Sequence, residues 1–172
     1  MRIPLLALVM MALVTLGLTP VSTMAQTEQP QVGTETGLPL PRYVSLKISS
    51  GRARRGPSTA HRVDWVFARR GMPLRVTGEF ENWRRVEDSE GEGGWMHYSA
   101  LSGVRTVLVT RDMTPMLSRP QLEAPQVAIL ETGVVAHIME CVTDWCRLSI
   151  DGTRGWADRS ALWGIDPGEV LD

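Results

Sequence analysis

The sequence predicts an all-β protein whose folded part consists of two small β-barrels in tandem, after a signal peptide that is removed. The chain of 172 residues contains 16 Gly and 11 Pro, a composition that favours short strands joined by many turns. After the first 25 residues, no stretch has an apolar period of 3.6 residues over eleven positions, the pattern of an amphipathic helix. A repeat of about 62 residues divides the folded part into two similar units.

The N-terminal segment has the pattern of a secretory signal peptide. Arg2 precedes the uncharged apolar run 3–18, and Thr23 and Ala25 occupy the −3 and −1 positions of a small-x-small cleavage site. The run of 16 residues is short for a membrane span, which needs roughly 20, so cleavage is favoured over an uncleaved anchor. We therefore expect a periplasmic or secreted protein that begins at Gln26 and keeps no stable membrane anchor.

The segments on either side of the repeat are expected to add little to the fold. The stretch after the signal holds Gln, Thr, Glu, Gly and Pro with few apolar groups, so it cannot bury enough surface to fold by itself. The C-terminal end is short and acidic. The predicted organisation is a signal peptide at 1–25, a flexible leader at 26–41, a first domain at 42–103, a second domain at 104–164 and an acidic tail at 165–172.

The repeat rests on landmarks that recur at constant spacing. Trp83 follows Gly71 by twelve positions, and Trp145 follows Gly133 by twelve positions. The period is 62 residues up to Trp83 and Trp145, and 61 residues from Gly94 and Gly155 onward. One domain that merely uses Trp often would not explain this spacing. The later landmarks, in matching order, are Gly94-Trp95 and Gly155-Trp156, Ser99-Ala100-Leu101 and Ser160-Ala161-Leu162, and Gly103 and Gly164.

Each unit is predicted to contain about five short strands. In the second unit, 134–139 and 145–150 have strand composition, and Asp151-Gly152 is a strong signal for a two-residue hairpin turn. The matching turn of the first unit, 89–93, is one residue longer, which accounts for the change of period from 62 to 61. Barrels of this size lie near the lower limit for an independent core.

A short motif opens the first unit, where 53–58 has the sequence Ala-Arg-Arg-Gly-Pro-Ser. It is followed by a Gly-led strand, by Trp83, and by Gly94-Trp95 with Leu101. This order resembles the bacterial SH3-like (SH3b) pattern, in which an R-x-G-P segment precedes "G-W-x-x-V" and a closing "G-W-V…L".

The resemblance covers nearly all of the folded chain, residues 43–164. The segments 64–71 and 80–86 resemble a secreted proteobacterial subfamily that carries two such domains. The resemblance implies SH3-like barrels that act as a binding or targeting module, often toward cell-wall peptides, and not as a catalyst.

The sequence departs from eukaryotic SH3 domains where those hold Pro-rich peptides. The closing segment of that family carries a Pro and a Tyr, and these places are taken by His97 and Ala100 in one unit and by Asp158 and Ala161 in the other. Recognition of PxxP ligands is therefore not expected, whatever the fold.

Few residues are candidates for catalysis. His137 lies four positions before Cys141, as a cysteine hydrolase could require, but two Cys five positions apart in an exported protein more often form a disulfide. No G-x-S-x-G, P-loop or H-E-x-x-H motif is present, and the His and Cys residues lack metal-ligand spacing. We expect no enzyme activity, no metal and no cofactor. A cluster of carboxylates in one turn is expected to be solvated charge: Glu87, Asp88, Glu90 and Glu92.

The two cysteines are predicted to form a disulfide. Cys141 and Cys146 bracket a four-residue connection of a length common in hairpins, which would place them opposite each other on neighbouring strands. The 62-residue period maps them onto Glu79 and Arg84, an opposite-charge pair. We therefore expect an exposed salt bridge in the first unit where the second has a covalent link. Two free thiols are the alternative.

Two Trp-x-Arg pairs are the candidate ligand-binding residues: Trp83 with Arg85, and Trp145 with Arg147. Strand parity places Trp145 and Arg147 on the face opposite Cys146, Leu148 and Ile150, which form the natural core. A flat aromatic beside a guanidinium suits sugar faces and peptide carboxylates. The alternative is that the Trp side chains seal a barrel end or the contact between the units.

Charge is divided unevenly between the units. Residues 42–103 carry 11 basic and 7 acidic side chains, net +4, whereas 104–172 carry 6 basic and 10 acidic, net −4. The first unit could bind an anionic envelope polymer or an acidic partner, or the two units could neutralise each other. The total charge of −1 argues against a nucleic-acid partner. Six arginines crowd the early part of the first unit: Arg52, Arg54, Arg55, Arg62, Arg69 and Arg70.

These observations predict a non-catalytic, exported binding module whose partner is peptidoglycan or an envelope protein. A structural or scaffolding protein with its Trp faces buried between the two domains is the first alternative. A hydrolase that uses Cys141 or Cys146 is the second.

Overall fold

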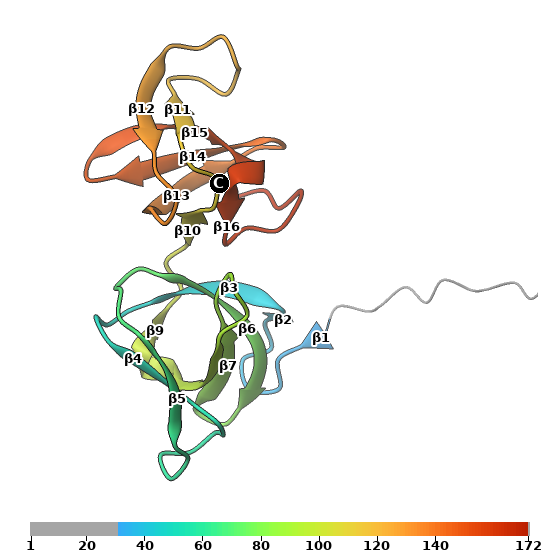
Figure 1. Cartoon of the computed structure of the whole chain (residues 1–172). Helices are drawn as coiled ribbons and strands as arrows, with labels where there is room; N and C mark the ends of the chain where they lie inside the picture. Colours follow the sequence, from blue (N-terminus) through green and yellow to red (C-terminus); the bar gives the residue numbers. More distant parts are fainter. Residues whose placement is uncertain (1–30, 172) are drawn as a thin grey trace, which may run out of the picture.

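The computed structural model describes residues 31–171. They form two antiparallel sheets of seven strands, each curled into a barrel, and a separate two-stranded hairpin (Figure 1). The helical elements in this range are two 3-10 helices of three residues each, and no helix in it has the length and apolar character needed to cross a membrane. The predicted all-β class with two tandem barrels is therefore confirmed. The predicted signal peptide lies outside the described residues.

The first barrel has the strand order β5-β4-β8-β7-β6-β3-β9. The 3-10 helix η1 (Tyr98–Ala100) joins its last two strands. The strands are β3 (Arg42–Leu46), β4 (Gly51–Arg54), β5 (Val63–Phe67), β6 (Pro73–Phe80), β7 (Trp83–Glu87), β8 (Gly93–His97) and β9 (Leu101–Ser102).

The second barrel repeats this order as β12-β11-β15-β14-β13-β10-β16, with η2 (Arg159–Ala161) in the place of η1. In Figure 1 it lies above the first barrel. Its strands are β10 (Thr106–Val109), β11 (Thr114–Leu117), β12 (Gln126–Leu130), β13 (Val135–Cys141), β14 (Trp145–Ile150), β15 (Thr153–Asp158) and β16 (Leu162–Trp163).

Each sheet has seven strands where about five were predicted. The hairpin of β4 and β5, and its counterpart of β11 and β12, supplies much of the difference. Four of the five residues of β5 are exposed, so this strand lacks the alternation of buried and exposed positions that marks a strand in a sequence.

Each barrel has its own apolar core. In the first, Val76 of β6 and Val86 of β7 are fully buried and pair directly across the two strands. In the second, Leu148 of β14 is fully buried beside the disulfide. Fully burying one such side chain contributes about 1.5–3 kcal/mol, so alternate positions along β6, β7 and β14 fix the register of each sheet.

Glycine is required where β8 and β15 meet the neighbouring strand. A Cβ on Gly94 would lie 2.5 Å from the carbonyl oxygen of Arg54, and a Cβ on Gly155 would lie 2.9 Å from that of Leu117. Any larger residue would push β8 away from β4, and β15 away from β11. The Gly-Trp dipeptides of the repeat therefore mark the positions where these strand pairs meet.

The turn between β14 and β15 has the predicted geometry. Asp151 and Gly152 have φ angles of 47° and 85°, as a two-residue hairpin turn with positive φ at both positions requires. In the first barrel the matching connection is one residue longer: seven residues separate the paired Val86 and Gly94, whereas six separate Leu148 and Gly155. There the carboxylate of Asp88 accepts hydrogen bonds from the backbone of Glu90 and Glu92, so this acidic side chain is structural.

The terminal segments are more ordered than predicted. β1 (Gln31–Val32) pairs with β2 (Pro39–Leu40), so the flexible leader is wrong for residues 31–41. In the tail, Ile165 is buried in the second core and Leu171 pairs with Cys141. Amino-acid composition did not predict this order, because it measures only how much apolar surface a segment can bury. Buried polar side chains of the barrels also hold the backbone of both segments: Glu79 bonds the N-terminal one and Arg159 the C-terminal one.

The two barrels touch through several side chains, of which the sequence singled out only Arg69, whose guanidinium donates to the Gly133 carbonyl. The ring of Tyr43 meets that of Trp163 edge-on at 5.3 Å between centroids, and the Thr106 hydroxyl donates to the Gly71 carbonyl at 2.7 Å. Within residues 31–171 no ion pair joins the two barrels. Direct pairing of opposite charges therefore does not hold them together in the described structure.

Candidate binding groove of the first barrel

A groove opens on the surface of the first barrel between β4, the start of β7 and η1. Its volume is about 410 Å³, within the range of small-molecule sites. We call it the first-barrel groove. Its lining residues are Ile48, Ser50, Arg52, Arg54, Thr59, Trp83, Met96, His97 and Ala100.

Strand parity places Trp83 in the first-barrel groove. It is the first residue of β7, whose buried positions are Arg84 and Val86, so its own side chain lies on the outer face. The indole meets the His97 ring edge-on at 5.6 Å. The His97 ring is itself held at the start of η1, where its Nδ1 lies 2.8 Å from the hydroxyl of Ser99. The two rings thus form a fixed aromatic wall.

Two arginines make the first-barrel groove basic. The Arg54 guanidinium donates to the carbonyl oxygens of Thr59 and His61 at 3.2 and 2.6 Å, which orients it along the loop between β4 and β5. Arg52 is exposed and has no carboxylate within ion-pair distance among the described residues. No acidic side chain is among the lining residues. The groove therefore joins aromatic surface to positive charge.

The other four arginines of the predicted basic surface lie elsewhere. Arg55 and Arg62, on the loop between β4 and β5, both pair with Asp64 of β5, so one carboxylate offsets half of their charge. Arg69 and Arg70 lie at the junction of the two barrels. The basic stretch of the sequence is thus divided among three places in the fold.

The second barrel lacks this groove chemistry. Leu117 pairs with Trp156 as Arg54 pairs with Trp95, so an apolar side chain takes the place of the oriented arginine. Two positions earlier on the same strand, Pro115 stands where β4 has Arg52.

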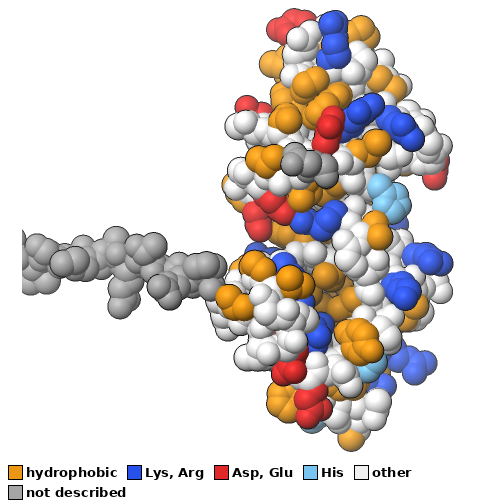
Figure 2. All heavy atoms as spheres, turned by 180° about the vertical axis from the view of Figure 1, so that it is seen from behind, with side chains coloured by type: hydrophobic (Ala, Val, Ile, Leu, Met, Phe, Trp, Pro, Cys, Tyr) orange, Lys and Arg blue, Asp and Glu red, His pale blue; other side chains and the backbone are white. Residues whose placement is uncertain are grey.

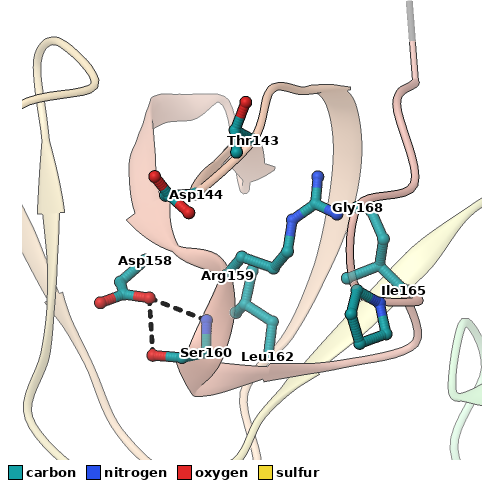
Figure 3. A pocket seen from close by; sticks show the side chains of 9 residues that line it. Thr143, Asp144, Asp158, Arg159, Ser160, Leu162, Ile165 and Gly168 are labelled. Atoms are coloured by element: carbon teal, nitrogen blue, oxygen red, sulfur yellow. Dashed lines mark hydrogen bonds between the residues drawn. The ribbon is translucent and has the colours of Figure 1, made fainter.

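A hollow of the second barrel has a different lining (Figure 3). Its volume is about 440 Å³. Asp158 accepts hydrogen bonds from the backbone and the hydroxyl of Ser160 at 2.8 and 2.6 Å, and it thereby caps η2. The Arg159 guanidinium donates to the carbonyl oxygens of Val142, Asp166 and Glu169, so it holds the C-terminal segment against the barrel.

The four predicted ligand-binding residues are not brought together. Trp83 lies in the first-barrel groove, while Arg85 is exposed on the same face opposite Trp95 and does not line it. Trp145 is half-buried on β14, and Arg147 lies 3.7 Å from the Glu140 carboxylate. Their role in binding stays a prediction.

Sequence reasoning missed the partners of Trp83. Arg52 and Arg54 come from β4, and His97 comes from the end of β8. The cluster of arginines was noticed in the sequence, but only the pairing of β4 with β8 brings two of its members beside the indole. His97 was noted only as a departure from the eukaryotic closing segment.

The predicted disulfide is present. Cys141 and Cys146 are cross-strand partners on β13 and β14 and are bonded to each other, so the described chain has no free cysteine. The matched pair in the first barrel, Glu79 and Arg84, is also a cross-strand pair, with Arg84 Nε 3.5 Å from Glu79 Oε1.

The Glu79 carboxylate was expected to be exposed, and that expectation is wrong. Its side chain is completely covered, because the β1–β2 hairpin folds over it. The carboxylate accepts from the Thr36 hydroxyl at 2.7 Å, from Arg42 at 2.6 Å and from the backbone N–H groups of Glu35 and Thr36 at 3.0 Å. Burial alone would raise the pKa of Glu79, but the hydrogen bonds from Thr36 and Arg42 outweigh it and lower the pKa to about 2.

Comparisons with known proteins place the chain in a family. No curated protein matches it. Among solved structures, NlpC2 of Trichomonas vaginalis matches with 14% identity and a TM-score of 0.33 over 72% of this chain and 48% of that one. NlpC1 of the same organism matches with 14% identity and a TM-score of 0.34 over 76% and 48%. This chain therefore spans about half the length of either structure. The family model for the bacterial SH3 domain matches twice, at residues 49–103 and 110–164, and the chain belongs to this family.

Proposed function

We propose that the protein is a non-catalytic, exported binding module that attaches to peptidoglycan or another component of the cell envelope through the first-barrel groove. The observation that carries the proposal is the meeting of Trp83, His97, Arg52 and Arg54 around one open groove with no acidic lining residue. Membership of the bacterial SH3 family supports it, because these domains commonly bind cell-wall components.

The chemistry of the first-barrel groove suits such a ligand. An indole face packs on the apolar face of a sugar ring, and the edge-on contact with His97 keeps one face of the Trp83 ring fixed. A guanidinium forms two parallel hydrogen bonds to a carboxylate, and Arg54 is already oriented by two carbonyl oxygens. Glycan and acidic peptide are the two components of peptidoglycan, so one groove can contact both.

Two features weaken the alternative functions. A cysteine hydrolase needs a thiolate, but Cys141 and Cys146 are bonded to each other. A scaffold with its Trp faces between the domains would need Trp83 at the barrel contact. The aromatic pair found there is instead Tyr43 with Trp163, and Trp83 lines a groove of its own barrel.

Co-sedimentation with purified sacculi tests the proposal. The variant Arg52→Gln removes an exposed charge of the groove that makes no ion pair in the described structure, so its fold should be unchanged. Arg119→Gln is the matched control, because Arg119 is an exposed arginine of the second barrel. We expect Arg52→Gln to weaken binding about tenfold, the usual effect of losing one charge-assisted hydrogen bond, and Arg119→Gln to bind like the parent protein.

A second variant tests the aromatic part of the groove. Trp83→Ala should abolish co-sedimentation while shifting the melting midpoint by only a few degrees. A large drop in the midpoint would assign Trp83 to the core instead, since truncating a buried aromatic costs about 3–5 kcal/mol. Unchanged binding by both Trp83→Ala and Arg52→Gln would refute the proposal.

A further inference from the structure

Each barrel ends its sheet in a strand with an open edge. β5 is the last strand of the first sheet and pairs with β4, and β12 is the last strand of the second sheet and pairs with β11. Within residues 31–171 no strand pairs with the other edge of either one. Such an edge offers backbone N–H and C=O groups to a strand of another molecule.

Both open strands expose apolar side chains. Val66 and Ile129 hold equivalent positions, since each pairs with the second residue of the preceding strand, and they are 50% and 46% exposed. In Figure 2 hydrophobic side chains are exposed at the upper end of the molecule, which the second barrel forms. Edge strands are usually protected by charged residues, but β12 has none and β5 has only Asp64. The exposed apolar residues are Val63, Trp65 and Val66 of β5 and Val127 and Ile129 of β12.

The surroundings of the two strands carry opposite charge. Residues 42–103 have a net charge of +4 and residues 104–172 of −4, and no ion pair joins the two barrels within the described range. Directly before β5, Arg62 shares the Asp64 carboxylate with Arg55, which leaves a positive surplus there. Directly after β12, Glu131 is exposed and has no ion-pair partner among residues 31–171.

We propose that copies of this chain associate through antiparallel pairing of β5 of one copy with β12 of another. Both strands have five residues, so they can overlap along their whole length. Full overlap places Val66 opposite Val127 and Arg62 opposite Glu131. An apolar cross-strand pair and an opposite-charge pair both stabilise such a contact.

Pairing of like strands fits less well. Full antiparallel overlap of β5 with a second β5 places Arg62 opposite Ala68 and next to Arg69, so like charges meet. The same overlap of β12 with a second β12 places Glu131 opposite Pro125 and brings no opposite charges together. The charges therefore favour the contact between unlike strands.

The contact can occur twice between the same two copies. In Figure 1 β12 belongs to the upper barrel and β5 to the lower one, so each copy offers one strand of each kind. Two contacts related by a twofold axis close a dimer in which the copies run in opposite directions. No residue of β5 or β12 lines the first-barrel groove, so the dimer has two open grooves.

Sedimentation velocity of the protein over a range of concentrations tests this contact. We expect a dimer whose fraction increases with concentration and decreases with added salt, which screens exposed charge pairs. Val66→Asp and Ile129→Asp should each weaken association by about tenfold or more, because each buries an unpaired carboxylate in the contact. Leu38→Asp is the matched control, since Leu38 is also 50% exposed but lies outside both strands, and it should associate like the parent protein.

Mixing the two variants tests which strands meet. The Val66→Asp copy keeps an intact β12 and the Ile129→Asp copy keeps an intact β5, so the mixture should associate more tightly than either variant alone. Melting midpoints like that of the parent show that both variants fold. Association does not depend on the first-barrel groove binding anything, so Trp83→Ala should associate like the parent.

Charge reversal gives an independent test of the register. Glu131→Arg should weaken association, and the double variant Arg62→Glu with Glu131→Arg should restore it. A protein that stays monomeric at millimolar concentration would overturn the inference. Loss of association in Val66→Asp but not in Ile129→Asp would overturn the pairing of unlike strands, as would a mixture that associates no better than its components.

Discussion

Replacing Glu79 by Gln removes the charge that holds the N-terminal hairpin to the first barrel. The carboxylate is completely covered and accepts from Arg42, from Thr36 and from two backbone N–H groups. A neutral amide leaves Arg42 and Arg84 without their counterion. The turn between β1 and β2 should detach before the barrel itself unfolds, because the backbone N–H groups of Glu35 and Thr36 donate to this side chain. Leu40 of β2 is buried in the core of the first barrel and should stay in place.

The magnitude follows from the pKa of Glu79. A value of about 2 in the folded protein, against 4.5 for a free glutamate, corresponds to about 3 kcal/mol at about 1.4 kcal/mol per pH unit. Because the folded pKa lies below the unfolded one, this stabilisation is complete above pH 4.5 and decreases as the pH falls toward 2. The difference between parent and Glu79→Gln should therefore be about 3 kcal/mol at pH 7 and about 1.4 kcal/mol at pH 3.

Hydrogen exchange measures the effect in each barrel separately, which matters because two barrels need not unfold as one unit. The amides of Val76 and Val86 report on the first barrel and that of Leu148 on the second. Glu140→Gln is the matched control. Glu140 and Arg147 lie 3.7 Å apart and about 40% of each side chain is exposed, so the loss of this pair should lower the free energy of unfolding by less than about 1 kcal/mol. A Glu79→Gln effect as small as the control, or equal at pH 7 and pH 3, would refute the reasoning.

Three further predictions concern the covalent structure and the backbone. Titration of the unfolded, non-reduced protein should find no thiol, and replacing Cys141 and Cys146 together by Ser should cost about 2 kcal/mol; two reactive thiols would contradict the disulfide. Gly94→Ala should destabilise the first barrel by more than about 1 kcal/mol, because its Cβ would lie 2.5 Å from a β4 carbonyl oxygen, whereas Gly103→Ala meets open space and should be nearly neutral. Mass spectrometry of the exported protein should find Gln26 at the N-terminus, and an intact leader would contradict cleavage.

Much of the fold was predictable because local signals and the repeat agree. Asp151-Gly152 specifies its turn through backbone preference alone, and the period places Glu79 opposite Arg84 just as Cys141 lies opposite Cys146. The terminal segments were not predictable from composition. Their order depends on buried polar groups of the barrels, which meet them only after folding.

The candidate site was predictable only in part. Parity correctly placed Trp83 on the outer face, because alternation is a property of one strand. Its partners Arg52, Arg54 and His97 come from other strands, so their position depends on the closure of the barrel. Arg85 shows the same dependence on neighbouring strands. It lies on the same face of β7 as Trp83, and yet it does not line the groove.

Mapping the contact with soluble peptidoglycan fragments by NMR tests the central claim most directly. The account predicts that the indole N–H of Trp83 and the backbone amides of Arg52 and His97 shift in a saturable way, and that Arg52→Gln weakens the same binding curve. Shifts confined to the second barrel, or no shifts at fragment concentrations that saturate other cell-wall binding domains, would contradict it.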